Sequence, residues 1–194
     1  MKHVILVPDS FKGTLSSAEI CSVLRSEILR HFPDCAVSCV PVADGGEGSV
    51  DCFLTALGGR RVPTTVCGPF GEPVDAFFGF LPDGKTAVVE MAACAGLPLA
   101  EGRLDPLRAT TFGVGELFLA AAELGASKII VGLGGSATND GGCGAAAACG
   151  VRFLNRSGEP FVPTGGTLAQ ITRIDTSGFS PRFAGCSVYR HVRH

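Results

Sequence analysis

The chain has 194 residues, of which 46% are hydrophobic and 18% charged, and its formal net charge is −2. This composition is typical of a folded globular protein and excludes a disordered polypeptide. With one Tyr, no Trp and no excess of basic residues, the sequence lacks the signature of nucleic-acid binding. No apolar run reaches the roughly 18 residues of a membrane span. We therefore expect the protein to bind a small molecule and to bind neither nucleic acid nor a membrane. A homo-oligomer is compatible with the sequence.

The sequence contains nine cysteines, an odd number, and no CxxC pair. Most of them stand where Ala or Val would serve in an apolar pattern. We expect reduced thiols in a cytoplasmic protein, in preference to disulfides or metal ligands. The N-terminal segment MKHVILVPDSFKG has an apolar core that is too short for a signal peptide, which agrees with a cytoplasmic location.

The first 42 residues predict a strand, a loop, a helix and a second strand. Residues 3–7 are an apolar run that Pro8 ends, and residues 36–42 form a similar run. Ser16 with Glu19 three residues later is typical of a capping box at the start of a helix. A β-α-β order is the unit from which parallel sheets are built.

Three polar, glycine-bearing loops each follow a predicted strand. They are residues 8–13 (PDSFKG), 44–48 (DGGEG) and 132–142 (GLGGSATNDGG), the last after the apolar run at 128–131. In open α/β sheets, ligands bind beyond the carboxyl ends of the strands. We therefore expect the three loops to share one site, although each one alone is also compatible with an ordinary strand-to-helix turn.

The loop at residues 132–142 carries the densest signal, because it combines glycines with hydroxyl, amide and carboxylate side chains. A run of small residues, 143–149, follows it and predicts a helix. The unpaired amides at the start of such a helix can bind an anion, and glycine lets the backbone approach a ligand. The alternative is a tight connection without a ligand.

The middle of the chain changes from helix-strand alternation to strands joined by turns. A helix at residues 49–57 precedes strands at 61–66, 74–81 and 86–91, and a further helix is expected at 114–124, with Thr110 and Thr111 as cap candidates. The predicted fold class is therefore α/β, a parallel-sheet βαβ core with an inserted, largely antiparallel β-rich subdomain. We expect the core to comprise residues 1–60 and 110–194, and the insertion to comprise residues 61–109.

The side-chain chemistry favours phosphate handling. None of the four histidines lies near a candidate nucleophile in the sequence, which argues against a His-assisted hydrolase and a zinc site. Carboxylates, hydroxyls, backbone amides and Lys12 remain, a set suited to phosphate with Mg²⁺. Lys12, beside Asp9 and Ser10, can neutralise charge on a transferring phosphoryl group; the alternative is an exposed surface lysine.

Two carboxylates of one loop, Asp44 and Glu47, are candidates to hold Mg²⁺ or to accept a substrate proton. Acids at a helix N-terminus are also stabilised by the helix dipole, and Asp140 has the same two interpretations. The candidate catalytic residues are Lys12, Asp44 and Asp140. The candidate phosphate- or substrate-binding residues are Asp9, Ser10, Gly45, Gly46, Glu47, Gly134, Gly135, Ser136, Thr138, Asn139 and Gly141.

The motifs PDSFKG, ADGGEG and GLGGSATNDGG occur here in the order that is found in the bacterial type glycerate kinase family, which the chain resembles up to about residue 185. The segment at residues 90–96 (EMAACAG) is similar to that family as well. The resemblance implies ATP-dependent phosphorylation of glycerate to a phosphoglycerate with Mg²⁺. The alternative is a non-catalytic fragment or binding protein for a small phosphorylated or carboxylated ligand. A hydrolase ranks last, because no activated nucleophile is found.

Members of that family are considerably longer, so we expect this chain to represent only the N-terminal half to two-thirds of one. Residues 189–194 (YRHVRH) form a basic, histidine-rich tail that does not resemble the strand that follows in the family. Whether such a chain is active by itself is left open by the sequence.

Overall fold

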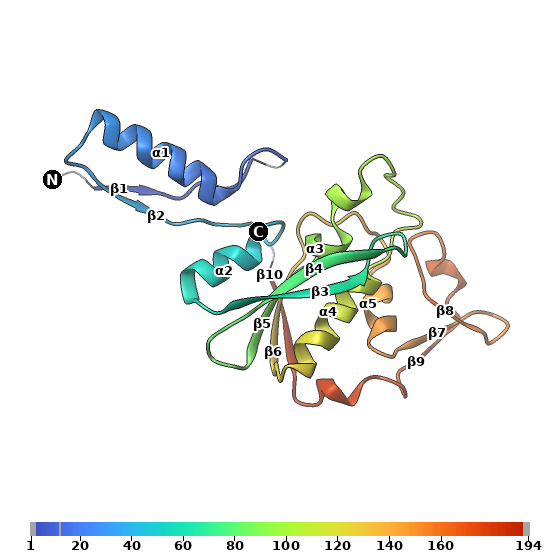
Figure 1. The fold of residues 1–194 in the computed structure, drawn as a ribbon. Helices are drawn as coiled ribbons and strands as arrows, with labels where there is room; N and C mark the ends of the chain where they lie inside the picture. The colour runs from blue at the N-terminus through green and yellow to red at the C-terminus, as the bar shows by residue number, and fades with distance from the viewer. Residues whose placement is uncertain (1–2, 12, 192–194) are drawn as a thin grey trace. The chain divides into compact units, whose positions relative to one another are not determined.

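The structure is a computed structural model that describes residues 3–11 and 13–191 (Figure 1). The chain divides into two compact units, Met1–Asp44 and Gly45–His194. This division differs from the expected one, which placed boundaries near residues 60 and 110. The two units are described separately below.

The first unit is the predicted β-α-β element. Strands β1 (His3–Leu6) and β2 (Ala36–Cys39) pair in parallel, and helix α1 (Ser17–His31) connects them. The capping box is present: the Ser16 hydroxyl accepts from the Glu19 N–H at 3.2 Å, and the Glu19 carboxylate accepts from the Ser16 N–H at 2.8 Å. Local sequence signals were therefore sufficient to predict this unit.

The second unit is built on a five-stranded mixed sheet with the order β10-β6-β5-β4-β3. Strand β6 pairs in parallel with both β5 and β10, whereas β3, β4 and β5 form an antiparallel meander. The strands are β3 (Arg60–Cys67), β4 (Pro73–Phe80), β5 (Thr86–Glu90), β6 (Lys128–Gly132) and β10 (Ser187–His191). The α/β class is confirmed, and the expected antiparallel strands are part of the main sheet of this unit because β5 lies alongside β6.

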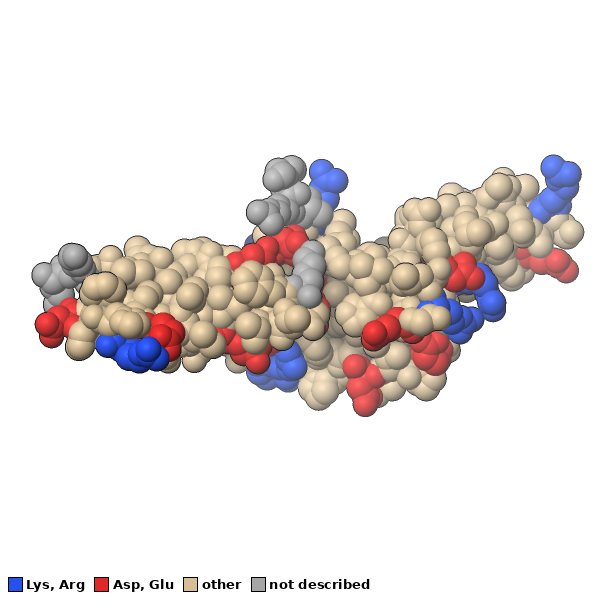
Figure 2. All heavy atoms as spheres, turned by 90° about the horizontal axis from the view of Figure 1, so that it is seen from above, with Lys and Arg blue, Asp and Glu red and all other residues tan. Residues whose placement is uncertain are grey.

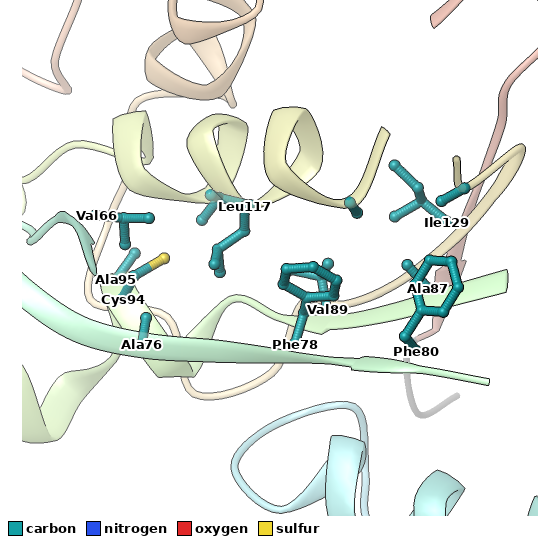
Figure 3. Close-up of a cluster of buried hydrophobic side chains, with 13 residues drawn as sticks. Val66, Ala76, Phe78, Phe80, Ala87, Val89, Cys94, Ala95, Leu117 and Ile129 are labelled. Carbon is teal, nitrogen blue, oxygen red and sulfur yellow. The ribbon is translucent and has the colours of Figure 1, made fainter. Parts of the chain in front are cut away.

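The sheet is covered on both faces, and the side chains of its strands alternate between them. Helix α4 (Phe112–Glu123) packs over Phe78, Val89 and Ile129 (Figure 3), whereas Val88 on the opposite face packs with Val50 of helix α2 (Ser49–Leu57). This alternation is the period of two that a pleated strand imposes. Both faces of the central strand β5 are therefore buried, which explains the apolar residues Ala87, Val88 and Val89 at its centre.

Short elements complete the second unit. A small antiparallel sheet has the order β8-β7-β9. These elements are α3 (Ala92–Ala95), η1 (Leu97–Ala100), α5 (Cys143–Ala148), β7 (Arg152–Leu154), β8 (Pro160–Phe161), η2 (Leu168–Gln170), β9 (Arg173–Asp175) and η3 (Pro181–Phe183).

Strand β10 is formed by the last described residues of the chain. Residues 187–191 pair in parallel with the whole of β6, so a strand forms here although residues 189–191 do not resemble the strand of the family. An edge strand tolerates polar and exposed side chains, and Val188 and Tyr189 are about half exposed, at 51% and 52%. The Lys128 ammonium lies 5.2 Å from the Tyr189 ring centroid, a cation–π contact between the paired strands. Residues 192–194 lie outside the described residues.

All nine cysteines lie within the described ranges, and no disulfide joins any of them. Burial raises the pKa of Cys94 to about 12 and that of Cys149 to about 11, so both remain protonated at neutral pH. On the face shown in Figure 2, Lys and Arg side chains are interspersed with Asp and Glu. Among the described residues, no helix is long and apolar enough to cross a membrane.

Leu117→Ala tests the core beneath α4. Leu117 is fully buried at 0% exposure, whereas Leu124, at the end of the same helix, is 45% exposed. We expect Leu117→Ala to lower the free energy of unfolding by about 2 to 5 kcal/mol, through lost burial and a residual cavity. Leu124→Ala is the matched control and should cost less than about 1 kcal/mol. Urea titrations of both variants measure the difference; equal losses would contradict the core assignment.

Candidate functional site

Two of the three predicted loops meet backbone to backbone in the second unit. The Gly134 N–H donates to the Gly45 carbonyl oxygen at 2.9 Å. A Cβ atom on Gly134 would lie 2.6 Å from the Gly46 nitrogen, and one on Gly132 would overlap the Gly45 carbonyl oxygen. These positions therefore require glycine for the close approach of two main chains.

The third predicted loop, residues 8–13, belongs to the first unit. Within it, the Asp9 carboxylate accepts from the Ser10 N–H at 2.8 Å. Lys12 lies outside the described residues, and Asp44 is the last residue of the first unit. The prediction that these residues share a site with the glycine loops remains a prediction.

The opposite side of the signature loop, residues 132–142, is bonded to the segment that follows β5. The Leu97 N–H donates to the Gly135 carbonyl, and the Ala137 N–H donates to the Ala95 carbonyl, both at 2.9 Å. The loop is thus hydrogen-bonded both to Gly45 and to residues 95–97. Fixed on both sides, its backbone is a rigid platform for the side chains between them.

Polar side chains line this platform. The Ser136 and Thr138 hydroxyls are 2.7 Å apart, and the Ser136 oxygen also accepts from the Thr138 N–H at 3.1 Å. Both residues are partly buried, whereas Asn139 and Glu47 are exposed. Two hydroxyls, an amide and a carboxylate on rigid glycine-rich backbone can bind a polar anion and an associated cation.

Asp140 is enclosed by protein donors. It is 1% exposed, and its Oδ2 accepts from the Thr111 N–H and hydroxyl, each at 2.8 Å, and from the Gly144 N–H at 3.1 Å. Its Oδ1 accepts from the Gly142 N–H at 2.9 Å. Two amides at the start of α5, which the sequence suggested as an anion cradle, are therefore bonded to this carboxylate.

Thr111 occupies the cap position of α4, as expected, but its side chain makes no cap bond to that helix. The hydroxyl donates to Asp140 and accepts from the Ala145 N–H at 2.9 Å, so it bridges two helix starts. Because these partners are about thirty residues away, local sequence signals identified the position and missed the role.

Glu90 is a residue of this region that the sequence analysis did not select. It ends β5 opposite Gly132, is 2% exposed, and accepts from the Val50 N–H at 3.0 Å. Burial raises the pKa of its carboxyl above the ordinary value of 4.5, and the N–H groups of Val50 and Gly48 oppose that rise. The carboxylate thus caps α2, whose own cap residue Gly48 has no side chain. The sequence signal that could have identified Glu90 is a single acidic residue at the end of an apolar strand.

Among the described residues, no group of three or more His, Cys, Asp or Glu side chains could hold a metal ion. Mg²⁺ is commonly held by one or two carboxylates together with phosphate oxygens and waters, so a protein cage is not required. The exposed carboxylate of Glu47, beside buried Gly45 and Gly46, fits that kind of ligand.

Comparison with known proteins identifies the family. The model of the glycerate kinase family matches residues 4–192, and the chain belongs to this family. It is 48% identical over 180 residues to a glycerate kinase of Bacillus subtilis, covering 92% of this chain and 47% of the relative. It is 45% identical over 187 residues to glycerate 2-kinase of Escherichia coli, covering 95% and 49%.

The fold agrees with this assignment. A crystal structure of a Salmonella typhimurium LT2 protein, provisionally assigned as glycerate kinase 2, matches with a TM-score of 0.80 at 38% identity. The match covers 98% of this chain and 52% of that protein. The chain thus spans about half the length of the relatives that it matches.

Gly134→Ala tests the contact between the two glycine loops. The added methyl group would overlap the Gly46 backbone, so we expect displaced amide resonances of Gly45 and Gly46 and a stability loss of about 1 to 3 kcal/mol. Gly141→Ala is the control, because its Cβ would meet no atom within 4 Å and only its φ of +64° is strained. The control should leave the Gly45 and Gly46 resonances in place. Unmoved resonances in Gly134→Ala would contradict the contact.

Glu90→Gln tests the buried carboxyl. Because the folded pKa is raised, the unfolded chain loses its proton first as pH rises above about 4.5, and Glu90 lowers stability through that range. Glu90→Gln removes this contribution, so its stability relative to wild type should improve as pH rises from 4.5 to 7. Urea midpoints at several pH values measure the trend. The exposed Glu101→Gln is the control, and a parallel pH dependence of Glu90→Gln and wild type would contradict the assignment.

Proposed function

We propose that the chain provides the phosphate-handling loops of an ATP-dependent glycerate kinase, a phosphotransferase that acts on an alcohol group. The observation that carries the proposal is the backbone contact between residues 132–134 and residues 45–46, the two glycine motifs of the family. A simple strand-to-helix turn does not require a second glycine-rich loop packed against it. A phosphate site does benefit from one, because closely packed main chains can direct several N–H groups at one anion.

The reaction moves the γ-phosphoryl group of ATP to a glycerate hydroxyl. The hydroxyl oxygen forms the new P–O bond, ADP leaves, and the hydroxyl proton passes to a carboxylate. We propose Asp44 or Glu47 for that carboxylate, and Ser136, Thr138 and Asn139 as groups that orient the phosphates. Such a transfer depends mainly on positioning and on charge neutralisation, and Lys12 is proposed to supply positive charge to the transferring oxygens.

Mg²⁺ is proposed as the accompanying metal, and its protein ligand is whichever of Glu47 and Asp44 does not accept the substrate proton. When bound, Mg²⁺ neutralises phosphate charge. The Escherichia coli relative is named glycerate 2-kinase, and we accordingly propose the 2-hydroxyl as the acceptor. Nine cysteines without a disulfide favour the cytoplasm as the compartment.

The second candidate is a binding protein for a phosphorylated or carboxylated small molecule that catalyses no transfer. The observation that favours the second candidate is that the chain covers about half of the length of its relatives. The two candidates share the loops and differ in turnover.

The deciding experiment measures ADP formation by the purified 194-residue chain with ATP, Mg²⁺ and D-glycerate. We expect glycerate-dependent turnover with 2-phosphoglycerate as the product, identified by phosphorus NMR. Lys12→Ala should lower turnover by about 100-fold or more. Lys85→Ala removes an exposed lysine in the turn before β5 and should leave turnover unchanged.

Calorimetry with ATP and Mg²⁺ separates the remaining outcomes. Binding without turnover would support the binding protein and reject the kinase for this chain. Absence of both would reject the kinase and a binding protein for ATP. Formation of 3-phosphoglycerate would retain the kinase and reject the 2-hydroxyl as acceptor.

A further inference from the structure

We propose that Asp140 is a positioning residue that fixes the signature loop, and that the ligand-facing part of this loop ends at Asn139. The inference rests on the proposed function for what the loop binds. It divides one continuous motif into two parts: the side chains of Ser136, Thr138 and Asn139 face the ligand, whereas residues 140–144 join the loop to the starts of α4 and α5.

The first argument is the set of partners around the carboxylate. The two oxygens of Asp140 accept four hydrogen bonds at 2.8 to 3.1 Å, all from protein donors on Thr111, Gly142 and Gly144. A general base must come within hydrogen-bond distance of the proton that it removes. A carboxylate that is 1% exposed and already accepts four bonds is poorly placed for that contact and well placed to order the backbone.

The second argument is that the donors come from separate segments. Thr111 begins α4, whereas Gly142 and Gly144 begin α5, so one carboxylate joins two helix starts to the loop. The Thr111 hydroxyl extends the junction, because it accepts from the Ala145 N–H while it donates to Asp140. Loss of the carboxylate therefore loosens both helix starts together.

The third argument is close packing around the junction. A Cβ atom on Gly144 would overlap the Thr110 hydroxyl and lie 2.7 Å from both Asp140 Oδ2 and the Phe112 nitrogen. The carboxylate is thus surrounded by fixed protein atoms. The exposed side chain of Asn139, one residue earlier, marks the change from the buried to the accessible part of the motif.

The test is amide hydrogen exchange on the full chain, which needs no ligand. In Asp140→Asn, we expect the amides of Gly142 and Gly144 to exchange about tenfold or more faster than in wild type. The Val50 amide, held by Glu90 in the same unit, is the internal control and should be unchanged. Unchanged exchange at Gly142 and Gly144 in a folded variant would overturn the proposal.

A second pair of variants keeps the test decisive should Asp140→Asn not fold. Thr111→Val keeps the branched shape and removes the hydroxyl, whereas Thr111→Ser keeps the hydroxyl. We expect faster exchange at Gly144 and Ala145 in Thr111→Val and wild-type exchange in Thr111→Ser. Equal exchange in the two variants would overturn the proposed junction.

Binding separates positioning from proton transfer. With ATP and Mg²⁺ as the probe, Asp140→Asn and Thr111→Val should both weaken affinity, and Thr111→Ser should restore it. A large loss of turnover in Asp140→Asn with wild-type exchange and affinity would identify Asp140 as the base and reject the inference. Should wild type fail to bind ATP, the proposed function fails while the exchange data still decide the role of Asp140.

Discussion

The close contact of two main chains constrains the second unit more than any other feature. Gly134 donates to the carbonyl of Gly45, and no side chain fits between them. Strand β6 must therefore end where residues 45–46 pass, and the signature loop must turn away at once. The neighbouring strands set the position of that turn, since Gly132 pairs with Glu90 of β5 and with His191 of β10. The sheet thus positions the glycines, and the glycines allow the loops to meet.

Two buried carboxylates hold the helices next to these loops. Glu90 accepts from the start of α2, and Asp140 accepts from the starts of α4 and α5. Each one satisfies amides that would otherwise lack partners at a helix N-terminus. The polar groups left at the loop surface, on Ser136, Thr138 and Asn139, are then the ones suited to a ligand. Acidic side chains close to a suspected phosphate site therefore serve the architecture as well as the chemistry.

Local patterns predicted much of the fold. The capping box at Ser16, the helix at residues 49–57 and the three meander strands follow from signals within a few residues. Pairings between distant segments were beyond such signals. Nothing local indicates that β5 pairs with β6, or that polar β10 joins that sheet. The candidate site shows the same limit. Its glycines and hydroxyls stand in one local motif, whereas Thr111, a partner of Asp140, lies 29 residues away and Val50, the partner of Glu90, lies 40 residues away.

Helix α2 is capped by the Glu90 carboxylate of strand β5, and this has a consequence for the order of folding. Its own cap residue is Gly48, so the helix depends on a carboxylate that the chain supplies forty residues later. A nine-residue helix without that cap is marginal in water. We therefore expect helix α2 to become stable only once β5 has taken its place. Contacts of such large sequence separation slow folding, so we expect residues 45–48, before this helix, to take their shape late in assembly.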